Sequence, residues 1–306
     1  MPNWKSKVAI QAVLARVPFG EKVNHALQRL NKRAPVRKQE ILGILPTLSS
    51  GIALIKKHVA VEGASVVEVG TGWLPLPTTL LHLCGAKRIV SFDHERHVRY
   101  SLIREMLDVF SANRDTLANA LSLSVATLDE RLDRLHGATD LVEFLALAGI
   151  TYVAPGDATT TDLLDGEADL FYSYAVLEHV PEDVLNQLVV ESKRILRSGG
   201  CFYAFIGLHD HYACFDKRIS RVHFLQHPEW AWRLFVKNRI SYHNRLRERD
   251  FIETVERQGA RIMEINSVTD PEDVTRVKSM RLDERFLKFT PEECAVTSTE
   301  FVAKFP

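Results

Sequence analysis

Three histidines stand at positions where they could move a proton. His209 and His211 flank Asp210 in the segment HDH, directly after an apolar stretch, and His179 follows another apolar stretch in LEHV. Because the ordinary pKa of histidine is near 6.5, such a ring can accept a proton from a substrate at neutral pH. We expect a general base among His179, His209 and His211, with Asp210 orienting a ring. Polar turn residues without a catalytic part are the alternative.

The same residues do not predict a metal site. Two histidines at positions i and i+2 can converge in a loop, but no third ligand is evident beside them. Asp169 begins a predicted strand rather than ending it, so it is poorly placed for a metal at the strand ends. We therefore expect no bound metal.

A glycine turn follows the apolar run VVEV. Gly70 and Gly72 let the backbone turn tightly and approach a ligand closely. A dinucleotide needs backbone N–H groups near its phosphates, but the next residues are WLPLP, of which two prolines lack an N–H and the others are bulky. The turn favours an adenosine ligand without phosphates, and the Glu68 carboxylate just before it would suit a positive charge on that ligand.

Polar side chains end the neighbouring predicted strands. Asp93 ends RIVSFD, where a carboxylate can accept both ribose hydroxyls of an adenosine. Asp157 ends ITYVAPGD and could accept from an adenine amine, and Tyr174 lies near the end of ADLFYSYA. Ligands of doubly wound sheets bind in the crevice outside the carboxyl ends of the strands, so we expect these side chains to lie close together.

Strand and helix patterns alternate along the chain and predict an α/β fold. The expected architecture is a Rossmann-like, doubly wound, seven-stranded sheet, mostly parallel, with an antiparallel C-terminal strand. Five strands are expected at 66–69, 88–93, 150–157, 168–175 and 201–208, and ARIMEINSV and AVTSTEFVAKF form the last two. A helix is expected from Asn244 to Gln258.

Two regions are dominated by helical spacing. Residues 1–60 are expected to form a helical N-terminal cap, with helices at Ile10–Val17 and Val23–Leu30 and one or two more over 38–60, broken near Pro46. Residues 61–306 form the sheet domain, with an insertion of at least three helices at about 98–150. We expect the cap and the insertion to cover the cleft; structural padding is the alternative for the insertion.

Composition narrows the range of partners and compartments. The chain has 306 residues with 39 basic and 39 acidic side chains, and this zero net charge argues against nucleic acid as the main partner. The four cysteines form no CxxC pair, and no apolar run is long enough to span a membrane, so we expect a cytoplasmic protein. Residues 1–38 are basic and could touch a membrane surface weakly, although a solvated helix face is favoured.

The ordered motifs resemble the class I S-adenosylmethionine-dependent methyltransferases, of the methyltransferase type 11 kind. The motifs are VVEVGTGW, VSFD, APGDA, and ADLFYSYAVLEHVPE followed by RILRSGGCFYAFI. The resemblance implies S-adenosylmethionine as cofactor and implies contacts with it from Glu68, Gly70, Thr71, Gly72, Asp93, Asp157, Ala158 and Tyr174. Leu74 departs from the family pattern, where a third glycine is usual, and this puts the shape of the turn in doubt.

A narrower resemblance concerns the acceptor. ARVPFGEKVNHALQRL, HDHYACFDKRISRVHFL and SYHNRLRERDF look like segments of methyltransferases from bacterial polysaccharide and O-antigen clusters, which implies a sugar hydroxyl or amine. Arg218 and Arg245, with Asp210, could bind a charged acceptor, since guanidinium groups bind phosphate or carboxylate bidentately; surface ion pairs are the alternative. We expect a methyltransferase acting on a sugar or other small polar acceptor. An NAD-dependent oxidoreductase and a non-catalytic scaffold are the alternatives.

Overall fold

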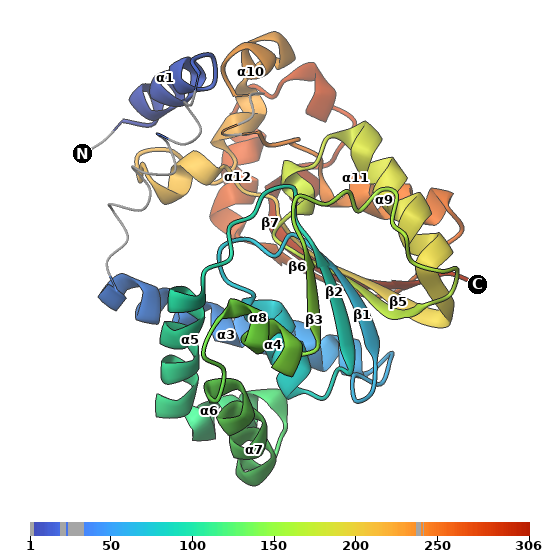
Figure 1. Ribbon diagram of the computed structural model, residues 1–306. Coiled ribbons are helices and arrows are strands. Elements are labelled where there is room, and N and C mark those ends of the chain that lie inside the picture. The colour runs from blue at the N-terminus through green and yellow to red at the C-terminus, as the bar shows by residue number, and fades with distance from the viewer. Residues whose placement is uncertain (1–2, 19–22, 24–33, 237–239, 241) are drawn as a thin grey trace.

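A seven-stranded sheet forms the centre of the molecule (Figure 1). The computed structural model describes residues 3–18, 23, 34–236, 240 and 242–306. The strand order is β3-β2-β1-β4-β5-β7-β6, in which β1 to β5 are parallel and β7 runs antiparallel to both of its neighbours. The strands are β1 (Ser65–Val69), β2 (Arg88–Phe92), β3 (Ile150–Val153), β4 (Ala168–Tyr174), β5 (Leu196–Gly207), β6 (Arg261–Thr269) and β7 (Val296–Lys304). The predicted fold class is confirmed.

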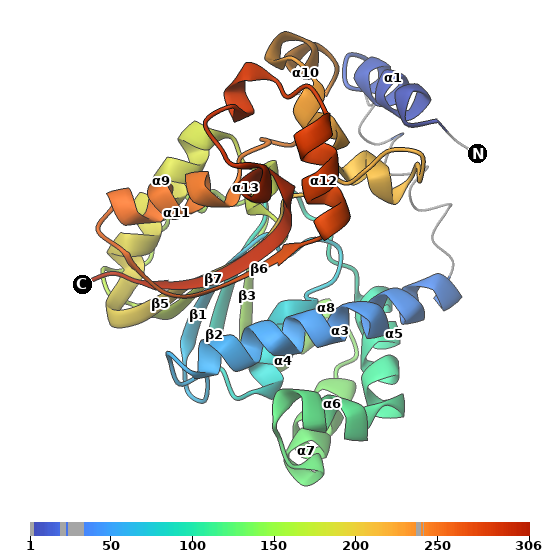
Figure 2. The same cartoon turned by 180° about the vertical axis from the view of Figure 1, so that it is seen from behind.

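The side chains of β1 alternate between two hydrophobic layers. Val66 packs into a core with α3 (Ala34–Lys56), α4 (Leu76–Leu83) and α5 (Tyr100–Ala112). Val67 packs on the opposite face, against α9 (Glu182–Ile195) and α11 (Glu248–Arg257). Figures 1 and 2 show these helices on the two sides of the sheet. Both faces are covered, which explains why β1 is apolar nearly throughout.

The insertion between β2 and β3 contains α5 and three further helices, α6 (Arg114–Leu121), α7 (Val125–His136) and α8 (Leu141–Leu147). Arg131 of α7 donates to the Leu83 carbonyl at 2.8 Å and pairs with Glu62, and Lys56 Nζ donates to the Leu121 carbonyl at 2.7 Å. Leu83 and Glu62 lie where strands begin. The expectation that the whole insertion covers the cleft is therefore wrong for α6 and α7, which lie at the opposite end of the sheet (Figure 1).

The N-terminal region contains two helices within the described residues. α1 (Trp4–Leu14) begins earlier than expected because the Asn3 side chain accepts from the Lys5 N–H and caps it. α3 continues through Pro46 without the expected break, and its apolar face joins the sheet core. The second expected helix, Val23–Leu30, lies largely outside the described residues, and the division of the chain at residue 60 stays a prediction.

A third layer lies beyond the carboxyl ends of the strands. It contains α1, α10 (Glu229–Phe235), α12 (Pro271–Ser279), α13 (Pro291–Ala295) and the short helices η2 (His211–Cys214), η3 (His223–Gln226) and η4 (Glu284–Phe286). α12 and α13 separate β6 from β7, and the antiparallel strand β7 lies inside the sheet, with β6 at the edge. α11 begins at Glu248 rather than at Asn244, so residues 244–247 are free to make other contacts. No helix in the described part of the chain is long and apolar enough to cross a membrane.

Candidate functional site

The turn after β1 depends on glycine at one position. Gly70 has a φ of 92°, and a Cβ atom there would lie 2.1 Å from Cγ2 of Val176. Its N–H donates to the Phe92 carbonyl at 2.8 Å. Gly72 has a φ of 65°, but a Cβ there would have no neighbour within 4 Å among the described residues. Gly70 therefore lets the chain pass beneath Val176, whereas Gly72 leaves space above the backbone.

Asp93 holds this turn against the end of β2. Its Oδ2 accepts from the Gly72 N–H at 2.7 Å and its Oδ1 accepts from the Glu95 N–H at 3.2 Å. Burial would raise the pKa of Asp93, but hydrogen bonds from His94 and from these two N–H groups outweigh it and lower the pKa below its usual value. An ionised carboxylate has lone pairs for about four hydrogen bonds, so beside these three Asp93 keeps capacity for about one more, such as a ribose hydroxyl.

Glu68 is the centre of a buried polar network. Ser91 Oγ donates to Glu68 Oε2, and Thr71 Oγ1 meets Ser91 Oγ. Glu68 Oε1 is buried without a hydrogen-bond partner in the described part of the chain. Burial raises the pKa of Glu68 to about 7; the Ser91 hydrogen bond opposes this and the Asp93 charge adds to it. A buried carboxyl group with an oxygen that accepts no hydrogen bond, next to the Gly70–Gly72 turn, could interact with a positively charged ligand.

Sequence reasoning missed Ser91. In the sheet Ser91 lies opposite Glu68 in the register of β1 and β2, so its hydroxyl faces the same side. The sequence signal was a serine in the second strand at the position that pairs with Glu68 of the first strand. The position could only be recognised once the register of the two strands was known.

The exit of β3 lies beside Asp93, because the Gly156 N–H donates to the Asp93 carbonyl at 2.8 Å. Asp157 is exposed, and its Oδ1 accepts from the N–H and the hydroxyl of Thr159, which lowers its pKa. Ala158 is buried, and the Tyr174 ring stacks on Phe205 with centroids 4.6 Å apart. The three residues are positioned around the same strand ends, and their contacts with an adenosine stay predictions.

Four histidines gather beyond β4 and β5. The His211 ring lies 5.0 Å from His179, 5.1 Å from His209 and 4.7 Å from His243, centroid to centroid. The structure therefore brings together the three histidines that were expected as alternative bases, and it adds His243, which the sequence reasoning missed. Three of these rings, His179, His211 and His243, help to line a cavity of about 190 Å³, and Lys7 and Gln11 of α1 line it too.

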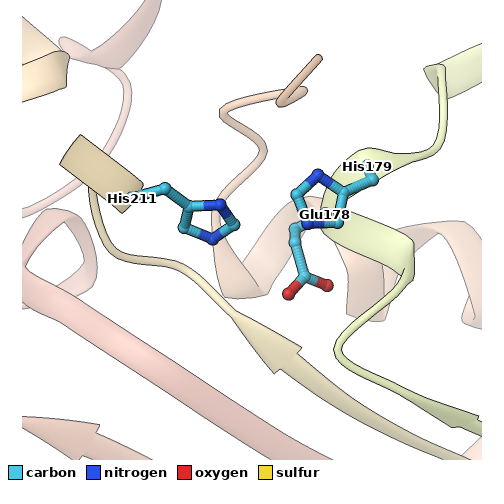
Figure 3. A group of neighbouring side chains, drawn as sticks. All are labelled: Glu178, His179 and His211. Atoms are coloured by element: carbon cyan, nitrogen blue, oxygen red, sulfur yellow. The ribbon is translucent and has the colours of Figure 1, made fainter. Parts of the chain in front are cut away.

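Glu178 lies at the base of this group (Figure 3). Its side chain is buried, Oε1 accepts from the Gly207 N–H at 3.2 Å, and Oε2 has no hydrogen-bond partner among the residues that the structure describes. Burial raises the pKa of Glu178 to about 8. Sequence reasoning quoted LEHV as a motif but assigned no role to Glu178. Its position next to His179 was the signal.

Burial keeps the histidines neutral. It lowers the pKa of His211 to about 3, helped by the neighbouring His179 and His209, and it lowers the pKa values of His179 and His209. His179 is exposed at one side, and its Nδ1 lies 2.8 Å from the Tyr242 carbonyl. Because a carbonyl oxygen only accepts, Nδ1 carries the proton and Nε2 keeps a free lone pair.

The segment 243–247 fixes both halves of the cavity. Asn244 Nδ2 donates to the carbonyls of Leu177 and Val180, at 2.8 and 2.9 Å, and so clamps η1 (Leu177–His179). Arg247 is fully buried and donates to the carbonyls of Leu208 and Val296. One short extended segment therefore holds the turn that carries Glu178 and His179 and also the strand end that leads to His209.

The expected acceptor-binding arginines are engaged elsewhere. Arg218 pairs with Asp216 through two bonds of 2.7 Å. Arg245 is fully buried and donates to Glu229, to the His227 carbonyl at 2.6 Å and to the Phe224 carbonyl at 3.1 Å. Neither side chain lines the cavity, so the expected clamp on a charged acceptor is not formed by this arrangement.

Asp210 does line the cavity, but its carboxylate serves other groups. Oδ1 accepts from the Tyr212 N–H at 2.8 Å and caps η2, and Oδ2 lies 3.4 Å from His223 Nδ1. The ring that it approaches is therefore His223 rather than His209 or His211. The interpretation of Asp210 as the residue that orients a base is not supported by these contacts.

Part of the chain is similar to a known protein family. A family model described as a methyltransferase domain matches residues 114–204, from α6 to within β5, which includes Glu178 and His179. The glycine turn and Asp93 lie outside the matched stretch. No curated protein matches the chain.

Several solved structures are similar to the chain at low identity. A geranyl diphosphate C-methyltransferase from Streptomyces coelicolor A3(2), in complex with Mg²⁺, geranyl diphosphate and S-adenosyl-L-homocysteine, is 11% identical with a TM-score of 0.47, over 88% of this chain and 83% of that chain. A putative methyltransferase from Bacillus halodurans C-125 is 18% identical with a TM-score of 0.44, over 84% and 99%. Similarity at these identities and TM-scores does not identify the acceptor of this chain. The family match makes residues 114–204 similar to a methyltransferase domain.

Proposed function

We propose that the chain transfers a methyl group from S-adenosylmethionine to a sugar or another small polar acceptor, and the match of residues 114–204 to a methyltransferase domain supports this. The observation that carries the proposal is the buried Glu68 carboxyl with its unused oxygen, beside the Gly70–Gly72 turn and Asp93. S-adenosylmethionine supplies an activated methyl group on a sulfonium, so the chain itself must hold the cofactor, align the acceptor and remove a proton.

The cofactor would be held at the ends of β1, β2 and β3. Gly72 leaves its backbone open to the methionine part, and Glu68 offers a carboxylate to the positive charge. Asp93 would accept from a ribose hydroxyl, and Asp157 and Ala158 would contact the adenine. Thr71 contributes indirectly, because its hydroxyl meets Ser91, which donates to Glu68.

The acceptor would enter the histidine-lined cavity at the ends of β4 and β5. Val176 lies against Gly70, and His179, three residues later, lines the cavity, which supports placing the acceptor next to the cofactor turn. A volume of about 190 Å³ suits a small acceptor group. Three imidazoles, Lys7, Gln11 and Asp210 give the cavity a polar side, and aromatic and aliphatic side chains, among them Phe224, Trp232 and Val236, line the rest. Among the expected bases, His179 is best oriented, because its Nε2 lone pair is free while Nδ1 is held by the Tyr242 carbonyl.

A sugar hydroxyl or amine in bacterial polysaccharide synthesis is the acceptor that we propose, on the resemblance of the segments around His211 and His243 to such enzymes. The cytoplasm is the proposed compartment. Four free cysteines, three of them buried, are consistent with reducing surroundings.

Two measurements test this function. Calorimetry with S-adenosylmethionine, S-adenosylhomocysteine and NAD⁺ should show binding of the first two and none of the third. The residues after the turn, WLPLP, include two prolines without N–H groups and three bulky side chains, so they do not form a binding site for a pyrophosphate. Transfer of a labelled methyl group is then screened against sugar nucleotides, with the His179→Ala variant as the control for base catalysis. Binding of NAD⁺ in preference to both adenosyl ligands would overturn the proposal and favour an oxidoreductase.

A further inference from the structure

We propose that Glu178, His179 and His211 bind a divalent transition-metal ion, with Zn²⁺ as the expected occupant. One ligand atom from each residue lies within 4.8 Å of the other two (Figure 3). The three residues come from two places in the chain, η1 after β4 and η2 after β5, so the sheet brings the set together. Glu178 supplies the third ligand that the sequence did not reveal beside the histidines.

The donor set determines the kind of metal. Two imidazole nitrogens and one carboxylate oxygen suit Zn²⁺ and neighbouring first-row ions, whereas Mg²⁺ and Ca²⁺ prefer oxygen ligands throughout. Three protein ligands leave a further position open, which is the pattern of catalytic rather than structural zinc sites.

The hydrogen bonds around the group orient its ligand atoms. The Tyr242 carbonyl accepts from Nδ1 of His179, so Nε2 is the atom with a free lone pair. The Gly207 N–H donates to Oε1 of Glu178, while Oε2 is buried and has no partner in the part of the chain that the structure describes. Metal-bound histidines commonly donate their other N–H to a carbonyl, and metal-bound carboxylates are hydrogen-bonded in turn.

The backbone around the ligands is held firmly from outside the group. Asn244 clamps η1 through three bonds, two from its side chain and one of 2.9 Å from its N–H to the Glu178 carbonyl. Asp210 accepts from the Tyr212 N–H and caps the short helix that begins with His211. These contacts place both ligand-bearing turns without using the ligand atoms themselves.

Some closure of the group is needed on binding. Two atoms bound to one Zn²⁺ at about 2.1 Å lie at most about 4.2 Å apart. The ligand atoms of Glu178, His179 and His211 lie within 4.8 Å of one another, which is a slightly wider spacing. The His211 ring makes no hydrogen bond to any residue of the described ranges and is half-exposed, so a rotation of this side chain can supply the difference.

The open coordination position would face the cavity, because both histidine ligands line it. This part of the inference rests on the proposed function and changes the part of His179 in it, because Nε2 would then be a metal ligand rather than the base. An acceptor hydroxyl bound at the open position would lose its proton more readily, since a bound metal acts as a Lewis acid. Metal binding itself does not depend on the cofactor or the acceptor.

The test uses the full chain without cofactor or acceptor. Chelator-treated protein is titrated with Zn²⁺ by calorimetry, and with Co²⁺ while its visible absorption is followed, and bound metal is counted by elemental analysis. We expect one ion per chain and a Co²⁺ spectrum of low coordination number. The variants His211→Ala and Glu178→Gln should each weaken Zn²⁺ binding by more than about tenfold.

A matched control separates this site from casual binding. His136→Ala removes a histidine from α7, in the insertion, and should leave Zn²⁺ affinity unchanged. Circular dichroism checks that each variant is folded, and the half-exposed His211 gives a variant that does not disturb the buried core. Zn²⁺ affinity that is equal in the wild type and His211→Ala, or no binding by the wild type, overturns the metal site and leaves the methyltransferase proposal untouched.

Discussion

The two halves of the candidate site are built in different ways. The cofactor half, at the ends of β1 and β2, is held by short bonds between neighbouring strand ends, such as Gly72 N–H to Asp93 and Ser91 to Glu68. The cavity half is assembled from segments far apart in the sequence. Lys7 of α1, His179, His211 and His243 all line one space there.

The sheet alone positions the cofactor half. The cavity half also needs a supporting segment from elsewhere in the chain. The carboxyl ends of adjacent parallel strands must meet, so the cofactor half follows from the strand order. The cavity half depends on residues 243–247, which bond to η1, to Leu208 just after β5, and to β7. Variants should therefore affect the two halves separately.

The largest expected effect is on stability at the support of the cavity half. Arg247→Ala removes a fully buried side chain and leaves the Leu208 and Val296 carbonyls without their donor, which should lower the free energy of unfolding by about 3 kcal/mol or more. Lys278→Ala is the control, because Lys278 and Glu292 form an ion pair in which both side chains are exposed, and its loss should change little. Denaturant unfolding followed by circular dichroism measures both. Equal effects of the two substitutions would contradict the supporting role of the 243–247 segment.

A second pair of variants tests the glycine turn of the cofactor half. Gly70→Ala should lower the free energy of unfolding by about 2–3 kcal/mol, because its Cβ would overlap Val176 at a positive φ. Gly72→Ala should cost only about 1 kcal/mol from backbone strain, since its Cβ has no neighbour among the described residues. Thermal unfolding compares their stabilities.

Cofactor affinity completes this comparison. Gly72→Ala should weaken S-adenosylmethionine binding although it unfolds almost as the wild type does, since the added methyl group occupies the space proposed for the ligand. A Gly72→Ala variant with full affinity would show that the cofactor lies away from this turn.

The third prediction concerns the ribose. Asp93→Ala should weaken S-adenosylmethionine binding by more than about tenfold, because a lost hydrogen bond to a charged group is worth about 1.5–3 kcal/mol. Asp157→Ala should have a smaller effect, since its carboxylate is exposed and Thr159 already donates to it. Calorimetry on both variants gives the ratio. An Asp93→Ala protein with wild-type affinity would refute the assignment of Asp93 to the ribose.

The sequence predicted the cofactor half more completely than the cavity half. Glu68, Gly70, Gly72 and Asp93 stand at strand ends, where periodicity and turn residues reveal them. Ser91 was missed because its part depends on strand register, which the spacing of apolar residues does not fix between two strands buried on both faces.

The cavity half was predicted only in part, because tertiary contacts decide it. HDH and LEHV marked the histidines, but the arginines were misjudged: Arg245 resembles a surface clamp in the sequence and is fully buried among carbonyls in the structure. His243 lies just before the helix that was expected from Asn244, in a loop that continues to the start of α11 at Glu248. The approach of α1 also depends on packing against α10 and η3, which no local pattern of residues 4–14 encodes.

The smallest expected effect is a pH dependence that belongs to the cofactor half alone. Glu68 has a pKa of about 7 because it is buried, so it is mostly protonated below that pH and ionised above it. A cationic cofactor favours the ionised form, and its affinity should therefore rise with pH, by up to about tenfold between about pH 6 and about pH 8, and level off above. Glu68→Gln keeps the hydrogen bond from Ser91 but cannot ionise, so its affinity should be flat over this range. Calorimetry at several pH values compares the two proteins. The same rise in both would assign the titration to another group, such as Glu178 in the cavity half, and would remove Glu68 from the charge recognition of the cofactor.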